Sequence, residues 1–275
     1  MTLSNDPLWP RAGDWPTPTG HADLALVGVP THESSLSPTN AHRTPAAVRD
    51  ALRRYSIQSS LSIVDVGDTL DVASLERIEA SLLIALGGDN SATVPVALAR
   101  WGSSIGTAGL VALDAHHDLR DGTSNGSPVR ELIEAGLDGR RVVQVGIEPF
   151  ANSEAYARRA RELGITVITR ADLERRGMAD AMAEALEIAS SGGGPVHVDL
   201  DVDVCDRSVA PACPASVPGG ISAWQLREAA RAAGAHAAVA SVDLVEVDAT
   251  ADAPDGRTVR LVALCVLEII RARGV

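Results

Sequence analysis

The amino-acid sequence predicts an α/β fold of three layers, with a mostly parallel sheet between two layers of helices. Short runs of Val, Leu and Ile alternate along the chain with longer stretches in which apolar residues have helical spacing. Strands that alternate with helices in this way form parallel sheets covered by helices on both faces. Apolar residues make up 45% of the chain, which is enough for one large core.

Each expected strand is a short apolar segment that ends near Gly, Pro, Asp or Ser, the residues that favour turns. The strands occupy residues 22–30, 61–66, a short segment ending at ALGGDNS, 109–113, 141–147, 165–168, 196–204 and 240–248. The helices between them occupy residues 44–56, a region from residue 73, 91–101, 127–135, 152–163, 171–190, 222–233 and 259–273. Thr44 is expected to cap the first helix, with Pro45 as its first residue. Residues 1–22 are expected to form an N-terminal arm on a single domain of residues 23–275.

The composition excludes several classes of partner. The formal net charge is −12, and every basic residue is Arg. Because nucleic-acid binding requires clustered basic residues, we expect neither nucleic acid nor an anionic membrane surface as a partner. No segment reaches the roughly 18 consecutive apolar residues of a transmembrane helix. The N-terminus lacks a signal-peptide pattern, and three scattered cysteines make no disulfide framework, so we expect a cytoplasmic protein.

The strand expected at residues 196–204 carries an unusual row of polar side chains. Val and Leu alternate there with His197, Asp199, Asp201 and Asp203. Period-2 alternation places all four polar side chains on one face of the strand. Buried carboxylates are costly unless a cation meets them, and open α/β sheets bind ligands at the carboxyl ends of their strands. We therefore expect this strand to deliver acids to a cationic ligand.

A second cluster follows the strand at residues 109–113, in the segment DAHHD. On an extended segment Asp114, His116 and Asp118 point the same way, and such a set can share a metal ion. A solvated strand-to-loop junction has the same composition, so DAHHD alone leaves both interpretations open. Together with Asp201 and Asp203 it predicts a binuclear site. Carboxylate oxygens with one imidazole favour Mn²⁺ over structural Zn²⁺.

Two other strand ends carry weaker signals. The GGDN segment that ends at Asn90 lacks the GxxxxGK[ST] pattern of a phosphate loop, and alone it predicts only a tight turn. Glu246, in VDLVEVD, is placed to orient a cationic substrate group, although a solvated strand end would look the same. His197 is expected to be a surface or loop residue rather than a ligand.

These segments resemble, in order, the motifs of the ureohydrolases, the family of arginase, agmatinase and formimidoylglutamase. VGVP…RTPAAVRDAL resembles the opening strand and helix, GGDNS resembles GGDHS, and DAHHD matches DAHxD. DLDVDVCDRSVAPACP aligns without gaps on S-x-D-x-D-x-x-D-P-x-x-x-P. The resemblance implies an arginase-like sheet of about eight strands. It also implies two Mn²⁺ per chain with a bridging hydroxide, hydrolysis of a C–N bond in an amidine or guanidine, and a homotrimer or hexamer.

The resemblance also implies a role for each matched residue. The implied metal ligands are Asn90, Asp114, His116, Asp118, Asp201 and Asp203. The implied catalytic residues are Asp118, which would hydrogen-bond the hydroxide or move its proton, and Glu246. The implied substrate-binding residues are Arg120, Asn125 and Glu246.

Several positions depart from the family pattern. Asn90 stands where the family has the His of GGDHS, and an amide oxygen is a poorer Mn²⁺ ligand than imidazole, so one metal is expected to be weakly held. Asn125 stands where arginase has a His that serves as a proton shuttle. Asp199 replaces a usual Ser, and Arg207 a usual Pro. The segment around Arg120 and the stretch PFANSEAY are closest to formimidoylglutamase. Arg120 either receives a substrate carboxylate by a bidentate contact or is a surface residue.

The expected function is Mn-dependent hydrolysis of N-formimidoyl-L-glutamate to glutamate and formamide. The first alternative is a guanidine hydrolase that acts on agmatine, arginine or a guanidino acid and releases urea. The second is a metal-binding family member with little catalytic activity, which Asn90 and Asn125 suggest. The sequence leaves open the substrate, the occupancy of both metal positions, the replacement for the shuttle His, and the oligomer interface.

Overall fold

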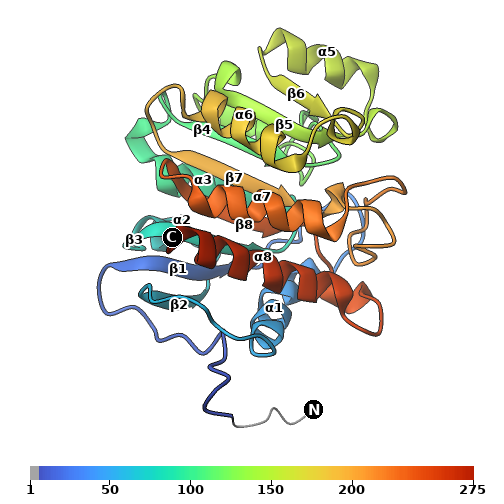
Figure 1. Cartoon of the computed structure of the whole chain (residues 1–275). Coiled ribbons are helices and arrows are strands. Elements are labelled where there is room, and N and C mark those ends of the chain that lie inside the picture. Colours follow the sequence, from blue (N-terminus) through green and yellow to red (C-terminus); the bar gives the residue numbers. More distant parts are fainter. Residues whose placement is uncertain (1–5) are drawn as a thin grey trace.

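The computed structural model describes residues 6–275, so residues 1–5 of the expected arm lie outside the described residues. Within this range the strands are β1 (Ala22–Val29), β2 (Ile63–Asp68), β3 (Ala80–Gly87), β4 (Gly109–Leu113), β5 (Val142–Ile147), β6 (Thr166–Thr169), β7 (Val196–Asp201) and β8 (Val239–Val245). They form one eight-stranded sheet in the order β2-β1-β3-β8-β7-β4-β5-β6 (Figure 1). All neighbouring pairs are parallel, which confirms the expected sheet.

Helices cover both faces of this sheet. The helices in the same range are α1 (Thr44–Leu52), α2 (Val72–Glu76), α3 (Thr93–Trp101), α4 (Pro128–Glu134), α5 (Glu154–Glu162), α6 (Met178–Ser190), α7 (Ala223–Ala235) and α8 (Arg257–Arg273). The largest apolar cluster joins one sheet face to α1, α6, α7 and α8, which lie in front of the sheet in Figure 1. Two further clusters join the opposite face to α2, α3, α4 and α5. The three-layer α/β/α prediction is therefore confirmed.

The largest boundary difference is at α6, which begins at Met178 rather than at residue 171, and smaller differences occur at other element ends. Thr44 is the first residue of α1 rather than its cap, because its hydroxyl donates to the Val247 carbonyl. Ser153 caps α5, which therefore begins two residues after the expected start at Asn152. Strand β7 ends at Asp201, and residues 202–204 form a 3-10 turn instead of continuing the strand. Asp203 therefore reaches the site from a turn.

The expectation that His197 is a surface or loop residue is wrong. His197 is fully buried in β7, with its ring edge-on to Trp101. Its Nδ1 lies 2.8 Å from the Ser241 hydroxyl and its Nε2 lies 3.2 Å from a carboxylate oxygen of Asp243, both on β8. Asp199 is buried on the same strand. Of the four polar residues that the alternation places on one face, only Asp201 and Asp203 line the cavity described below, and these are the two that were expected to be ligands.

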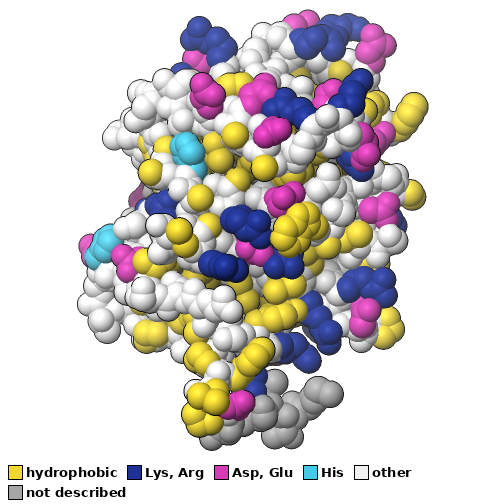
Figure 2. Space-filling view, viewed as in Figure 1, with side chains coloured by type: hydrophobic (Ala, Val, Ile, Leu, Met, Phe, Trp, Pro, Cys, Tyr) yellow, Lys and Arg dark blue, Asp and Glu magenta, His cyan; other side chains and the backbone are white. Residues whose placement is uncertain are grey.

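The described part of the arm, residues 6–21, runs along the edge of the sheet next to β2. Backbone amides connect it to the body, from Ala12 to the Tyr55 carbonyl at 3.0 Å and from Asp65 to the Pro16 carbonyl at 2.9 Å. Across residues 6–275 no helix combines the length and apolar composition that a membrane span requires. On the face that carries α7 and α8, acidic and basic side chains are interspersed rather than gathered by sign (Figure 2).

Candidate metal and substrate site

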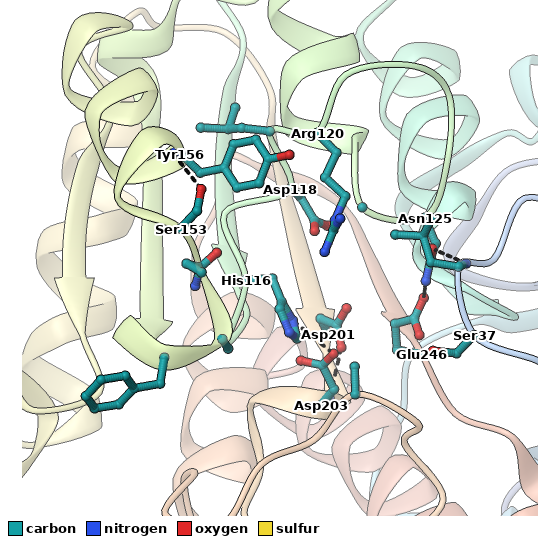
Figure 3. A pocket seen from close by; sticks show the side chains of 17 residues that line it. Ser37, His116, Asp118, Arg120, Asn125, Ser153, Tyr156, Asp201, Asp203 and Glu246 are labelled. Carbon is teal, nitrogen blue, oxygen red and sulfur yellow. Dashed lines mark hydrogen bonds and ion pairs between the residues drawn. The ribbon is translucent and has the colours of Figure 1, made fainter.

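Four central strands of the sheet end at one cavity. The carboxyl ends of β3, β8, β7 and β4 are adjacent in the strand order, so the loops that follow them meet. The cavity has a volume of about 460 Å³. Seven of the residues singled out in the sequence line it (Figure 3), namely His116, Asp118, Arg120, Asn125, Asp201, Asp203 and Glu246.

One half of the site is a three-residue cluster of potential metal ligands. Ligand atoms of Asp114, His116 and Asp203 all lie within 4.8 Å of one another. His116 Nδ1 is 3.3 Å from Asp114 Oδ1 and 3.2 Å from Asp203 Oδ2. Asp201 adjoins this cluster, because its Oδ1 accepts a hydrogen bond of 2.8 Å from the Asp203 amide.

The other half is formed by Asn90 and Asp118. Asn90 Nδ2 donates to Asp118 Oδ2 at 2.6 Å, while Asn90 Oδ1 accepts from the Thr93 hydroxyl at 2.6 Å. The amide oxygen that would serve as a metal ligand is thus engaged by Thr93. Thr93 was not singled out in the sequence, although a Thr three residues after Asn90, at the start of α3, is well placed to reach it.

The DAHHD segment is bent rather than extended, contrary to the sequence expectation. Asp118 has a φ of 51°, in the left-handed region that is strained for residues other than glycine. Neighbouring bonds hold the bend, from the His116 amide to Asp114 Oδ1 at 2.7 Å and from the His117 amide to Asn152 Oδ1 at 2.9 Å. Asn152, which also donates to the Ala115 carbonyl, is a positioning residue within the PFANSEAY stretch, to which the sequence assigned no role of its own.

Glu246 is held by two donors on a single oxygen. Its Oε1 accepts from the Asn90 amide at 2.8 Å and from Asn125 Nδ2 at 2.7 Å. Asn125 Oδ1 in turn accepts from the Leu36 amide at 2.9 Å, which ties the loop after β1 to the site. After Asp118, Glu246 is the second residue other than glycine that has a positive φ in residues 6–275, at 62°. Strain of roughly 1–3 kcal/mol at a residue of this kind persists only when the surroundings enforce it.

The site carries more acid than its own groups can neutralise. Burial, and then the charge of Asp203, raise the pKa of Asp114 to about 6 and that of Glu246 to about 8. The pKa values of Asp118 and Asp201 are raised well above their ordinary range, first by burial and then by neighbouring carboxylates. Burial lowers the pKa of His116, but the charges of Asp203 and Asp114 outweigh it and raise that pKa to about 12.

The donor set fits divalent cations. Asp203 Oδ1 is buried and accepts no hydrogen bond from the described residues, although buried carboxylate oxygens normally have a partner. The buried acids lie around one imidazole, and no Arg forms an ion pair with any of them within residues 6–275. Carboxylates with one imidazole are ligands that Mn²⁺ and similar ions accept.

Arg120 is the arginine among the residues that line the cavity. Its backbone amide donates to the Gly126 carbonyl at 3.0 Å, which holds the loop that carries it. Its guanidinium makes no hydrogen bond or ion pair with the residues that the structure describes, and it extends into the cavity (Figure 3). The nearby Arg130, by contrast, is engaged by the Arg120 carbonyl and by Glu134. An exposed, unpaired guanidinium is suited to bind an anionic substrate group.

Comparisons with known proteins show which family and which solved structures the chain is similar to. The arginase family model matches residues 22–271. A formimidoylglutamase of Halalkalibacterium halodurans is 34% identical, and the match covers 91% of this chain and 87% of that protein. A guanidinopropionase of Pseudomonas aeruginosa is 31% identical, with 91% and 88% covered. The crystal structure of formimidoylglutamase from Bacillus subtilis has a TM-score of 0.90 at 28% identity, covering 98% of this chain and 94% of that chain.

Proposed function

Because the chain belongs to the arginase family and is a hydrolase of that type, we propose that it cleaves N-formimidoyl-L-glutamate to glutamate and formamide. The observation that carries this proposal is the pairing of an acid-rich metal cluster with the unpaired guanidinium of Arg120 in one cavity. The acids suit an amidine, and Arg120 suits the carboxylate of an amino acid. The expected trimeric or hexameric assembly and the cytoplasmic location stay predictions.

We propose that the site holds two Mn²⁺ ions. The residues that would hold them are Asp114, His116, Asp118, Asp201 and Asp203. When bound, the two ions supply a Lewis acid and lower the pKa of a water that they share. Asn90 stays a predicted ligand, and the hydrogen bond from Thr93 leaves one of the two lone pairs of its oxygen for an ion. A neutral amide oxygen is a poorer ligand than imidazole, which supports the expectation that one ion is weakly held.

The chain's own residues would orient the substrate and move a proton. Asp118 Oδ2 is held by Asn90, which leaves Oδ1 to accept a proton from the attacking water and return it to the departing nitrogen. The bond that breaks joins the formimidoyl carbon to the glutamate nitrogen. Glu246 faces the same cavity and would hold the positively charged amidine nitrogen. With two carboxylates held at fixed positions, the reacting groups are oriented before the reaction starts.

Product analysis tests this function. The Mn²⁺-loaded protein is offered N-formimidoyl-L-glutamate, agmatine, arginine and 3-guanidinopropionate in separate assays for formamide and urea. We expect formamide and glutamate from the first compound and the highest kcat/KM for it. Urea from a guanidine as the main activity would replace the proposed substrate, an outcome that the 31% identity to a guanidinopropionase makes worth measuring. Two bound ions without any turnover would favour the metal-binding alternative.

Arg120→Ala is expected to weaken substrate binding without disabling the chemical step. Removing a charged hydrogen-bond partner of a carboxylate costs roughly 1.5–3 kcal/mol, so KM should rise at least about tenfold while kcat changes less. Steady-state kinetics on N-formimidoyl-L-glutamate provide the measurement. Arg120→Lys is the control, because it retains the charge but loses the fork geometry and should give an intermediate KM. An unchanged KM in Arg120→Ala would assign Arg120 to the surface instead.

Asn90→His is expected to tighten the binding of one Mn²⁺ by about tenfold or more, because imidazole is a better ligand than an amide oxygen. Titration of the metal-free protein with Mn²⁺, followed by the electron paramagnetic resonance of free ions, measures both affinities. Thr93→Val is the matched control, since it releases the Asn90 oxygen and leaves the ligand an amide. Unchanged affinities in Asn90→His would remove residue 90 from the ligand set.

A further inference from the structure

The two carboxylate oxygens of Glu246 are in different situations. Oε1 accepts both the Asn90 amide and Asn125 Nδ2, at 2.8 Å and 2.7 Å. Oε2 accepts no hydrogen bond from any residue that the structure describes, and Glu246 lines the cavity. Figure 3 shows the Asn125 amide between the Glu246 carboxylate and the loop that contains Ser37.

This difference limits what Glu246 can offer to a ligand. Each oxygen of an ionised carboxylate has about two lone-pair sites, so the two donors fill those of Oε1. A fork of two parallel N–H···O bonds needs one acceptor site on each oxygen. As long as Asn125 donates to Oε1, Glu246 can bind a cation through Oε2 alone.

We propose that Asn125 is a specificity-determining residue that makes the site select a formimidoyl group over a guanidino group. The inference rests on the proposed function for the identity of the substrate. A guanidinium group has two terminal amino groups where a formimidoyl group has one amino group and a C–H. The single free oxygen of Glu246 is sufficient to accept the one terminal amino group of a formimidoyl group. A guanidinium bound in the same place cannot form the fork of two parallel bonds, so its second amino group is left with a bent and therefore weak bond to the same oxygen.

The geometry assigns this restriction to Asn125 rather than to Asn90. The Asn90 contact comes from a backbone amide, which every residue type at position 90 except proline would supply. The Asn125 contact comes from the side chain, so a substitution at 125 removes it. Asn125 is itself held in place through its Oδ1 by the Leu36 amide, which fixes its Nδ2 toward Glu246. A ligand donor that is buried without an acceptor loses the hydrogen bond that it had to water, which lowers the affinity of that ligand by about tenfold or more.

Asn125→Ala tests the proposal. The substitution frees one acceptor site on Oε1, so the ratio of kcat/KM for N-formimidoyl-L-glutamate to that for 3-guanidinopropionate should fall by about tenfold or more. Asn125→Ser, whose hydroxyl is too short to reach Glu246, is a second variant with the same expectation. Ser37→Ala is the matched control. It removes a polar side chain from the same cavity wall, where Ser37 makes no hydrogen bond to Glu246, and should leave the ratio unchanged.

A binding measurement separates this inference from the proposed function. Equilibrium dialysis with the Mn²⁺-loaded protein gives the dissociation constants of N-methylformamidinium and N-methylguanidinium, a formamidinium with one terminal amino group and a guanidinium with two, and binding needs no turnover. We expect the parent protein to prefer N-methylformamidinium, and both Asn125 variants to gain affinity for N-methylguanidinium relative to N-methylformamidinium. If the parent releases no formamide but these relative affinities shift as expected, the function fails and the inference stands. Relative affinities that stay the same in both Asn125 variants overturn the inference, whatever the substrate.

Discussion

Asp201→Ala is expected to remove both metal ions and nearly all activity. Asp201 is 2% exposed at the end of β7, between the Asp203 turn and the cavity, and would be a ligand that both ions share. Mutation of a residue that only hydrogen-bonds to a metal ligand typically lowers metal affinity or activity by roughly 10–100-fold. Loss of the ligand itself should therefore lower kcat/KM by more than about 100-fold. Metal content per chain after gel filtration and steady-state kinetics together measure the effect.

Asp201→Asn separates the two contributions of this side chain. The amide oxygen of Asn can still accept the Asp203 amide, so the turn that carries Asp203 is retained, while the negative charge is lost. If the negative charge of Asp201 holds the ions, Asp201→Asn and Asp201→Ala should lose the metal ions and the activity to the same extent. Both metal-free variants should be at least as stable as the metal-free parent at pH 8, because a buried acid is removed from a cluster of acids. Two tightly bound ions in Asp201→Ala would exclude Asp201 from the ligand set.

Periodicity and turn residues in the sequence were enough to predict the sheet and the edge where the site lies. Parallel strands such as β4 and β7 can be recognised from short apolar runs in the sequence. The carboxyl ends of parallel strands all lie at the same edge of the sheet. Asp114, His116, Asp118, Asp201 and Asp203 could therefore be expected near one another before any coordinates were known. The structure brings these five residues together, while their roles as ligands stay predictions.

The local shape of the site could not be read from the same patterns. Asp118 and Glu246 have left-handed backbones, a conformation that their residue types disfavour and that only the surrounding hydrogen bonds enforce. Asp203 was expected on a strand, but its amide turns back to Asp201, so its side chain leaves the period-2 pattern. Long-range partners are not encoded by spacing along the chain. Asn125, for example, meets Glu246 from 121 positions away.

The burial of His197 shows how a local pattern can point the wrong way. His197 matches no ligand motif, and it was therefore expected to be a surface or loop residue although it belongs to the polar row of a central strand. In a central strand of a parallel sheet both faces are covered, so a polar side chain there must find a partner on the next strand. His197 contacts Ser241 and Asp243 on β8. These partners can be identified only when the order of the strands in the sheet is known.

The metal-free protein is expected to lose stability as the pH rises from about 5 to about 8, and Mn²⁺ is expected to restore it. Folding raises the pKa of Glu246 from 4.5 to about 8 and that of Asp114 from 3.8 to about 6, first by burial and then by the charge of Asp203. A carboxyl whose pKa is higher in the folded state contributes its full stability below the unfolded value. It loses that contribution as the pH rises through the folded value. The pKa of His116 is raised from 6.5 to about 12, so His116 also contributes a loss of stability as the pH rises above 6.5.

Thermal unfolding of the metal-free protein between pH 5 and pH 8 measures this effect, which should reach about 5–10 °C. A bound ion adds about 2.7 kcal/mol when its concentration is 100 times the dissociation constant, so the loaded protein should show a flatter profile. Asp138, whose pKa is lowered to about 2 by Arg140, titrates below this window and does not contribute. Asp201→Asn should flatten the metal-free profile. A metal-free parent with the same melting temperature at pH 5 and pH 8 would mean that these acids do not repel one another in the folded state.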